Sequence, residues 1–304
     1  MEREEILQKI ESKYQDLGIP VDTMLEGLLY SKPMVYWDYI QADALLGLQT
    51  QRTTLPDEMI FIMYHQVNEL LFKMILLEID QIAKYESLNA ELFTKHLMRI
   101  SRYFDMLSSS FDIMGDGMDK DQYMKFRNTL APASGFQSAQ YRMIEFASTE
   151  LINLIDIRFR ATIDRDTPFE HAYEHLYWQA AGKNYNTGQK SILLDKFEKK
   201  YMGDFIDFMK DYNTTNISMK FKSLPEDVRS NLDLVNTMRH YDYTVNVKWV
   251  MSHYKAAAKY IGGGAATGGS DWTKYMLPKY QKRIFYPELW SEEEIENWGI
   301  TNLE

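Results

Sequence analysis

The sequence contains no cysteine. This absence excludes disulfide bonds, a thiolate nucleophile, iron–sulfur clusters and zinc sites built on cysteine. Histidine is also scarce, with six residues among 304. Any metal must therefore be held by histidine, aspartate, glutamate or tyrosine, and few imidazoles are available to do so.

The chain also has fewer basic than acidic residues, with 34 Lys and Arg against 44 Asp and Glu, which gives a formal net charge of −10. Nucleic acid requires a basic surface, so we expect no nucleic-acid partner. No run of 18 uncharged apolar residues is present, and we expect no segment that spans a membrane. The first residues, MEREEILQKI, are too acidic for a secretory signal or a transit peptide, which predicts a cytoplasmic protein.

The alternating pattern of β-strands is also missing, whereas helical periodicity recurs along the chain. We predict an all-α protein, a single large helical-bundle domain over residues 1–304 with roughly ten helices. Within it, residues 1–50 form an N-terminal helical arm and residues 51–304 form the core. Aromatic residues are abundant, with 21 Tyr, 15 Phe and 6 Trp, and suit either a core or a site for a flat ligand.

The segment from Asp57 to Ile82 is the strongest helix in the sequence. Apolar residues recur at i, i+3, i+4 and i+7, neither Gly nor Pro interrupts them, and acidic residues open the segment behind Pro56. Because it is apolar around most of its circumference, we expect it to be buried in the helical assembly. His65 lies in its middle and needs a partner there. It is either a functional imidazole or a core histidine bonded to a neighbour.

Arg142 is a second candidate. Ser134, followed three residues later by Gln137, predicts a capped helix that begins at Gly135 and carries Arg142 among aromatic residues. A buried guanidinium cannot lose its charge and needs a carboxylate. That carboxylate belongs either to a ligand or to a local acid such as Glu145.

His253 is the third candidate, near the end of a long helix expected from Arg229 to Ile261. The loop GGGAATGGSDW follows this helix. Its first glycines are a stop signal for the helix, but glycine-rich loops beside a rigid scaffold also often close over ligands. Thr267 and Ser270 offer hydroxyl groups in this loop.

The sequence HAYEH offers a rival site, because His171 and His175 are four residues apart with Glu174 between them. Such spacing could chelate a metal from one helical turn, although no third ligand is evident. His96 and His240 have the surroundings of ordinary surface or core histidines.

Three segments, taken together, resemble the tryptophan 2,3-dioxygenase family: DEMIFIMYHQVNELLFK, SGFQSAQYRMIEF, and Trp249-x-x-x-His253 followed by Thr267-Gly-Gly-Ser. They occur in the order of that family and near its spacings, and the resemblance extends from about Tyr36 to the glycine-rich loop. It implies an all-helical homotetramer that carries haem b and uses O₂ as co-substrate. It further implies cleavage of the indole C2–C3 bond of L-tryptophan to N-formylkynurenine, the entry to the kynurenine pathway of tryptophan catabolism.

The resemblance also implies roles on the haem. His253 takes the position of the axial ligand of the iron, with Trp249 beside the cofactor. His65 takes the catalytic position on the opposite side, near the indole N–H. With no cysteine in the chain, a haem here requires an axial histidine.

The same resemblance implies contacts to the substrate. Phe61 would pack on the indole ring, Arg142 would bind the carboxylate, and Thr267 would contact the ammonium group. Tyr36 and Tyr39 match tyrosines of the N-terminal arm that complete the pocket of a neighbouring subunit.

Some positions depart from the family pattern, among them Leu71, where Trp is usual, and Val250, where Arg is common. Substrate choice therefore stays open. The alternative is a haem enzyme of the same superfamily that oxygenates another aromatic amino acid or a substituted indole, in some cases with one oxygen atom. A non-catalytic helical binding protein that retains only the fold is a third reading.

Overall fold

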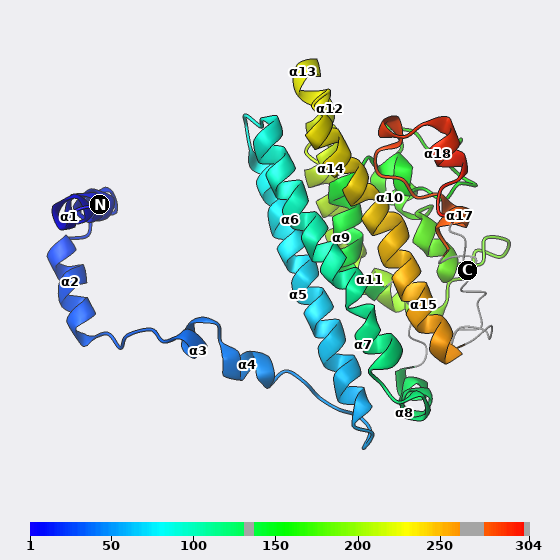
Figure 1. Cartoon of the computed structure of the whole chain (residues 1–304), viewed down its shortest axis with the longest axis horizontal. Helices are drawn as coiled ribbons and strands as arrows, with labels where there is room; N and C mark the ends of the chain where they lie inside the picture. The colour runs from blue at the N-terminus through cyan, green and yellow to red at the C-terminus, as the bar shows by residue number, and fades with distance from the viewer. Residues whose placement is uncertain (131–136, 262–276, 301–304) are drawn as a thin grey trace. The chain divides into compact units, whose positions relative to one another are not determined.

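The computed structural model describes residues 1–130, 137–261 and 277–300 (Figure 1). In these ranges the regular elements are helical, and β-structure is confined to two isolated bridges, Ile155 with Leu176 and Lys183 with Lys190. The prediction of an all-α fold is confirmed. The chain forms two compact units, Met1–Thr50 and Gln51–Glu304.

The first unit consists of four helices, α1 (Arg3–Asp16), α2 (Val21–Tyr30), α3 (Tyr36–Tyr39) and α4 (Ala42–Leu46), and none of them contains a buried residue. Tyr36 and Tyr39 lie on α3, whereas Asp43 lies on α4. Gln41 adopts a left-handed conformation, with φ of 54°, and this turn separates α3 from α4.

The second unit is built around α5 (Asp57–Lys84), which extends two residues beyond the predicted end. It lies beside α6 (Ala90–Ser109) and α9 (Ala139–Ser148), and α14 (Leu232–Tyr243) packs on α6 (Figure 1). Asn89 caps α6 by accepting a hydrogen bond from the Leu92 backbone N–H at 2.8 Å. The shorter elements after α6 are α7 (Phe111–Asp116), α8 (Lys120–Phe126) and the 3₁₀-helix η1 (Arg127–Leu130).

The long helix expected from Arg229 to Ile261 has three parts. It begins with α14 and continues through a π-turn, η5 (Thr244–Lys248), into α15 (Trp249–Ile261). Residues before Asn231 belong instead to the one-turn helix α13 (Glu226–Arg229). π-turns inside α-helices occur frequently at functional sites. This one lies directly before Trp249 and one turn or more before His253.

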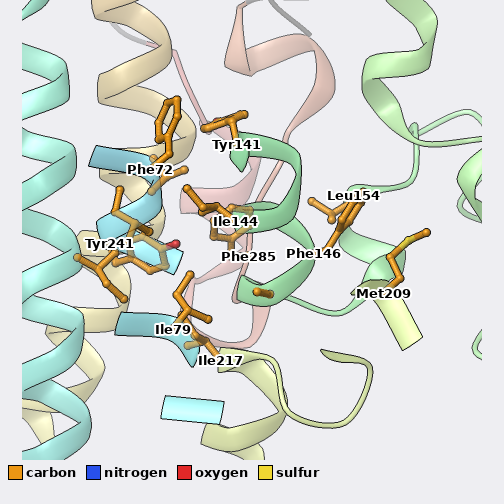
Figure 2. Packing of buried hydrophobic residues seen from close by; sticks show 14 of the residues in the cluster. Phe72, Ile79, Tyr141, Ile144, Phe146, Leu154, Met209, Ile217, Tyr241 and Phe285 are labelled. Atoms are coloured by element: carbon orange, nitrogen blue, oxygen red, sulfur yellow. The ribbon is translucent and has the colours of Figure 1, made fainter. Parts of the chain in front are cut away.

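The main hydrophobic core fills the space among α5, α6, α9, α14 and α11 (Ile192–Tyr212). Figure 2 shows side chains from distant parts of the sequence meeting there, among them Phe72, Ile79, Ile144, Tyr241 and Phe285. Burying each such side chain contributes about 1.5–3 kcal/mol. This packing fixes the helices that carry the candidate residues.

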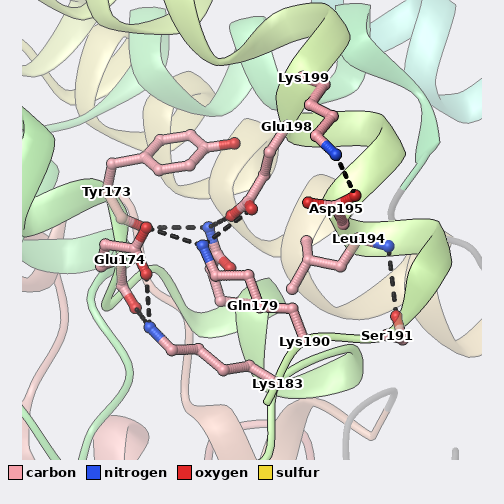
Figure 3. Close-up of polar contacts among 10 residues, drawn as sticks. All are labelled: Tyr173, Glu174, Gln179, Lys183, Lys190, Ser191, Leu194, Asp195, Glu198 and Lys199. Atoms are coloured by element: carbon pink, nitrogen blue, oxygen red, sulfur yellow. Dashed lines mark hydrogen bonds and ion pairs between the residues drawn. The ribbon is translucent and has the colours of Figure 1, made fainter. Parts of the chain in front are cut away.

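A network of ion pairs attaches the irregular segment before α11 to that helix (Figure 3). Lys190 contacts Glu174 and Glu198, each at 2.8 Å, and Lys183 contacts Glu174 at 2.5 Å. Gln179 donates to Glu198 at 2.9 Å. The helical turns of the remaining chain are η3 (Leu151–Leu154), α10 (Phe169–Tyr173), η4 (Tyr177–Ala181), α12 (Ile217–Lys222), α17 (Pro278–Gln281), η6 (Pro287–Leu289) and α18 (Glu292–Glu296).

One face of α5 differs from the prediction of burial around most of the helix. Met63, Val67, Leu70, Met74 and Leu77 recur at heptad-like spacing and are 42–59% exposed. Among the described residues, α5 is the one helix whose length and composition would allow it to cross a membrane. It nevertheless packs as a core helix on α6 and α9, and the described residues of the second unit leave the apolar stripe exposed.

Candidate active site

His65 and Phe61 lie one turn apart on α5, with ring centroids 4.1 Å apart. The Nδ1 atom of His65 is 2.7 Å from the Phe61 carbonyl oxygen. Because a carbonyl can only accept, Nδ1 carries the proton and Nε2 is left as an acceptor. Burial lowers the pKa of His65, against smaller opposite effects from the Phe61 hydrogen bond and Glu69. The side chain is nonetheless accessible to solvent. The region bordered by His65, His253 and the aromatic side chains around them is here called the recess.

His253 faces the same recess from α15. Its ring stacks on Phe111, with centroids 5.2 Å apart and planes 9° apart, and lies 6.1 Å from the Trp249 ring. Burial, aided by the charge of His65, lowers the pKa of His253 to about 4. The imidazole is therefore neutral near pH 7, which leaves a nitrogen lone pair available to a metal. Two aromatic rings connect the two histidines: the Tyr64 ring lies 5.4 Å from His65 and 6.0 Å from Phe111, on which His253 stacks.

Apolar and aromatic side chains surround these two histidines. A cluster separate from the main core joins α5, α7, α8 and α15, with Tyr64, Phe111, Met114, Met118, Phe126, Ala256 and Tyr260 buried and Phe61, Tyr123 and Trp249 partly buried. Phe61 lies 5.6 Å from Phe126 and 6.2 Å from Tyr123, measured between ring centroids. The arrangement suits a flat apolar group with a polar centre.

Arg142 has the second of the two environments that the sequence left open, a pair with a local acid. It is buried and pairs with Glu145 at 2.8 Å, and it donates to the Tyr177 hydroxyl at 2.8 Å. Its guanidinium also lies 4.6 Å from the Tyr141 ring centroid. The structure thus shows the local ion pair with Glu145, and it does not bring Arg142 into contact with Phe61 or His65. The carboxylate-binding role is not supported by this geometry.

The helix that carries Arg142 also begins later than predicted. Ser138 is its N-cap and accepts a hydrogen bond from the Tyr141 backbone N–H at 3.3 Å, so α9 begins at Ala139. The predicted capping residue Ser134 lies outside the described residues, as do Thr267 and Ser270 of the glycine-rich loop.

Arg127 is a functional candidate that the sequence reasoning missed. It follows α8 directly, is partly buried, and lies 5.9 Å from the Tyr123 ring centroid. Tyr123 in turn packs on Phe61, beside His65. The signal in the sequence is the pair Tyr123 and Arg127, four residues apart and therefore on one helical face. It is weak, because aromatic–arginine pairs at this spacing are common on surfaces.

The rival metal site is not favoured. The carboxylate of Glu174 is taken by Lys183 and Lys190, and Nδ1 of His175 is 2.9 Å from the His171 carbonyl oxygen. Within the described ranges, no group of three or more His, Cys, Asp or Glu side chains is placed to hold a metal ion. The other two histidines have ordinary partners: Nδ1 of His96 is 2.6 Å from Glu78, and Nε2 of His240 is 3.6 Å from Asp105.

Comparison with known proteins shows the relationships of the chain. The family model of tryptophan 2,3-dioxygenase matches residues 27–175, which include α5, α8 and α9. The chain belongs to the tryptophan 2,3-dioxygenase family. Its similarity to curated members extends further, over 86% of its length. The matched 86% of the chain includes both His65 and His253.

Three relatives from different bacteria illustrate this similarity, and each is named tryptophan 2,3-dioxygenase. That of Ruegeria sp. (strain TM1040) is 26% identical over 279 residues, covering 92% of the relative. That of Bacillus anthracis is 28% identical over 277 residues, again 92% of the relative. That of Polaromonas naphthalenivorans is 28% identical over 280 residues, 91% of the relative. Membership of this family makes the chain an oxidoreductase.

Proteins of this family are haem-dependent, and the residues of the recess fit a haem. His253 is neutral, as a histidine that binds iron must be, and aromatic side chains from four helices would provide walls for a planar macrocycle. The indole Nε1 of Trp249 is buried and has no hydrogen-bond partner in the described part of the chain. This N–H, one turn before His253, is a donor that a carboxylate group of the macrocycle would satisfy.

Proposed function

We propose that this protein is a haem-dependent dioxygenase that cleaves the indole C2–C3 bond of L-tryptophan with O₂ and yields N-formylkynurenine, a reaction of tryptophan catabolism in the kynurenine pathway. One observation carries the proposal: in a chain of this family, His65 of α5 and His253 of α15 both pack on one aromatic cluster, through Phe61 and Phe111. A single axial histidine leaves the opposite side of the iron open.

In this proposal His253 holds the iron of haem b, and Trp249 donates its indole N–H to the macrocycle. When bound, the haem supplies the iron on which O₂ reacts. The protein contributes the shape of the pocket and excludes water from it through the aromatic cluster. The low pKa of His253, about 4, keeps the ligand unprotonated over the physiological range.

His65 orients the substrate. Its Nε2 is an acceptor because Nδ1 donates to the Phe61 carbonyl, and the indole N–H is a matching donor. Phe61, 4.1 Å from the His65 ring, would pack on the indole plane. The two side chains fix the position of the reacting ring, which lowers the entropic cost of the reaction.

We assign the substrate carboxylate to Arg127 instead of Arg142. The charge of Arg142 is already neutralised by Glu145, whereas Arg127 lies on the Tyr123 ring beside Phe61. A guanidinium presents a rigid fork that matches a carboxylate. Thr267 remains the predicted contact of the ammonium group, supplied by the glycine-rich loop.

We further propose a cytoplasmic homotetramer. The helices of the arm bury no side chain, and Tyr36 and Tyr39 are 73% and 74% exposed. Such an arm gains a core only by packing on another surface, and the family places these tyrosines in a neighbouring pocket. The exposed apolar stripe of α5 is a second surface for self-association.

The test is an absorption spectrum of the purified protein, followed by product analysis with L-tryptophan and O₂. We expect a Soret band, its loss in His253→Ala, and its retention in His240→Ala, which removes an exposed histidine outside the recess. A colourless protein after supply of haemin would overturn the proposal. A product with one added oxygen atom, or turnover only with another aromatic amino acid, would favour the alternative of a related haem oxygenase.

A further inference from the structure

Arg283 lies at the centre of a buried polar network that the proposed chemistry does not use. It is 8% exposed and donates through Nη1 to Glu145 at 2.7 Å and through Nη2 to the Tyr141 hydroxyl at 3.0 Å. It also donates to the Tyr177 hydroxyl and, through Nε, to the side-chain oxygen of Asn246. One side chain thereby joins α9, the turn at Tyr177, the π-turn η5 and the C-terminal segment.

The charges of this network balance across two carboxylates and two guanidiniums. Glu145 faces both Arg142 and Arg283, which alone would leave an excess positive charge in the interior. Asp242 supplies the second negative charge, through Asn246, whose amide donates to Asp242 at 2.7 Å. Asp242 also accepts the backbone N–H groups of Phe285 and Tyr286 at 2.8 and 3.0 Å. A neutral network of this kind is stable only while each partner is present.

Arg283 contacts two residues that adjoin the start of α15. The first is Tyr141, whose ring stacks on Trp249 with centroids 4.6 Å apart and planes 29° apart. The second is Asn246, which lies within the π-turn that immediately precedes Trp249. Both contacts therefore affect the position of Trp249, one turn before His253.

We propose that Arg283 is a positioning residue for the iron ligand: by holding the Tyr141 hydroxyl and the Asn246 amide, it fixes the start of α15 and so the direction in which His253 presents its imidazole. The inference rests on the proposed haem function. Only arginine fits the position, because its planar fork donates to four acceptors at once, whereas lysine is a single point of charge with three donors. The contact with Asn246 lies within the π-turn, and such turns occur frequently at functional sites.

The test compares Arg283→Lys with Arg239→Lys. Arg239 is a matched control, because it ties α14 to the same C-terminal segment, at Leu289 and Glu294, but contacts neither Tyr141 nor the π-turn. Haem affinity is measured by titrating the haem-free protein with haemin, and the iron–histidine stretching band by resonance Raman spectroscopy of the ferrous protein. We expect Arg283→Lys to weaken haem binding about tenfold and to shift or broaden the band, while Arg239→Lys leaves both unchanged.

A second variant, Tyr141→Phe, keeps the ring on Trp249 and removes only the hydroxyl that Arg283 holds. If Arg283→Lys does not fold, Tyr141→Phe still tests the inference. We expect Tyr141→Phe to shift the iron–histidine stretching band by less than Arg283→Lys would. Unchanged haem affinity and an unchanged band in Tyr141→Phe and in every folded Arg283 variant would overturn the inference alone. A wild-type protein without any haem band would overturn the proposed function and this inference together.

Discussion

At the scale of single residues, two arginines beside aromatic side chains have opposite environments. Arg142 is enclosed by Glu145, Tyr141 and Tyr177, whereas Arg127 lies at the edge of the recess on Tyr123. Local sequence does not separate them, because both follow a tyrosine or phenylalanine in a short helix. The difference in environment arises from the residues that pack against each arginine in the folded protein.

Substitution of each arginine distinguishes their roles. Arg127→Gln should raise the KM for L-tryptophan at least tenfold with little loss of stability, because a carboxylate left without its partner costs about 2–5 kcal/mol. Arg142→Gln should leave KM nearly unchanged and lower the free energy of unfolding by about 3 kcal/mol, the low end for a broken buried pair, since Arg283 still contacts Glu145. Steady-state kinetics and urea denaturation measure the two effects. The reverse pattern would show that Arg142, and not Arg127, binds the carboxylate of the substrate.

His253 predicts a pH dependence of stability in the haem-free protein. Its native pKa of about 4 lies below the value of 6.5 expected for the unfolded chain. Between these values the unfolded chain binds a proton that the native histidine does not, so stability falls as the pH drops from 6.5 towards 4, by at most about 3 kcal/mol. Denaturation at pH 7 and pH 4.5 should show a smaller loss in His253→Gln than in the wild type. His240→Gln, the control, should lose as much as the wild type does.

At the scale of elements, α8 is held against the start of α5 by reciprocal hydrogen bonds. The Asp57 carboxylate accepts the Asp119 backbone N–H at 2.5 Å, and the Asp57 backbone N–H donates to the Gln122 side chain at 3.2 Å. Since α8 carries Tyr123 and leads into Arg127, this contact positions one wall of the recess.

Asp57→Ala should therefore impair substrate binding from a distance. We expect an increase in KM of about three- to tenfold, with a loss of about 1 kcal/mol in stability, as for a removed helix cap. Ser191→Ala removes the cap of α11, outside the recess, and should lower stability similarly without changing KM. Equal KM values in the two variants would show that the Asp57 contact does not position the site.

At the scale of the whole molecule, the described residues of each unit leave apolar side chains exposed, on the stripe of α5 and on the arm. The proposed homotetramer would bury them. A double substitution, Leu70→Glu and Met74→Glu, should dissociate the assembly, because charges at the centre of an apolar contact lose their hydration. Sedimentation equilibrium measures the mass. Ile192→Glu, at an isolated residue 73% exposed, should leave the assembly intact. An unchanged mass in the double variant would exclude the stripe as an interface.

Much of the fold could be predicted from the sequence, and for a local reason. The run of apolar residues with acidic residues behind Pro56 predicted α5 to within two residues, because helix periodicity and end signals act over a few neighbours. The π-turn and the break at Gln41 were not predicted. The π-turn is contacted from a distant part of the chain, by Arg283 at Asn246, which no local pattern records. Gln41 adopts a left-handed conformation and its side chain donates to the Asp38 carbonyl, a local arrangement that the helical periodicity does not show.

The sequence by itself determined the all-helical class, the exclusion of cysteine-based chemistry, and the family, through segments that keep their residues and spacing. The tertiary structure alone decided which arginine is paired internally, which face of α5 is exposed among the described residues, and that His65 and His253 pack on one aromatic cluster. The physical reason is distance along the chain. Glu145 and Arg283 are 138 residues apart, and no local pattern records that folding will bring their charges to 2.7 Å.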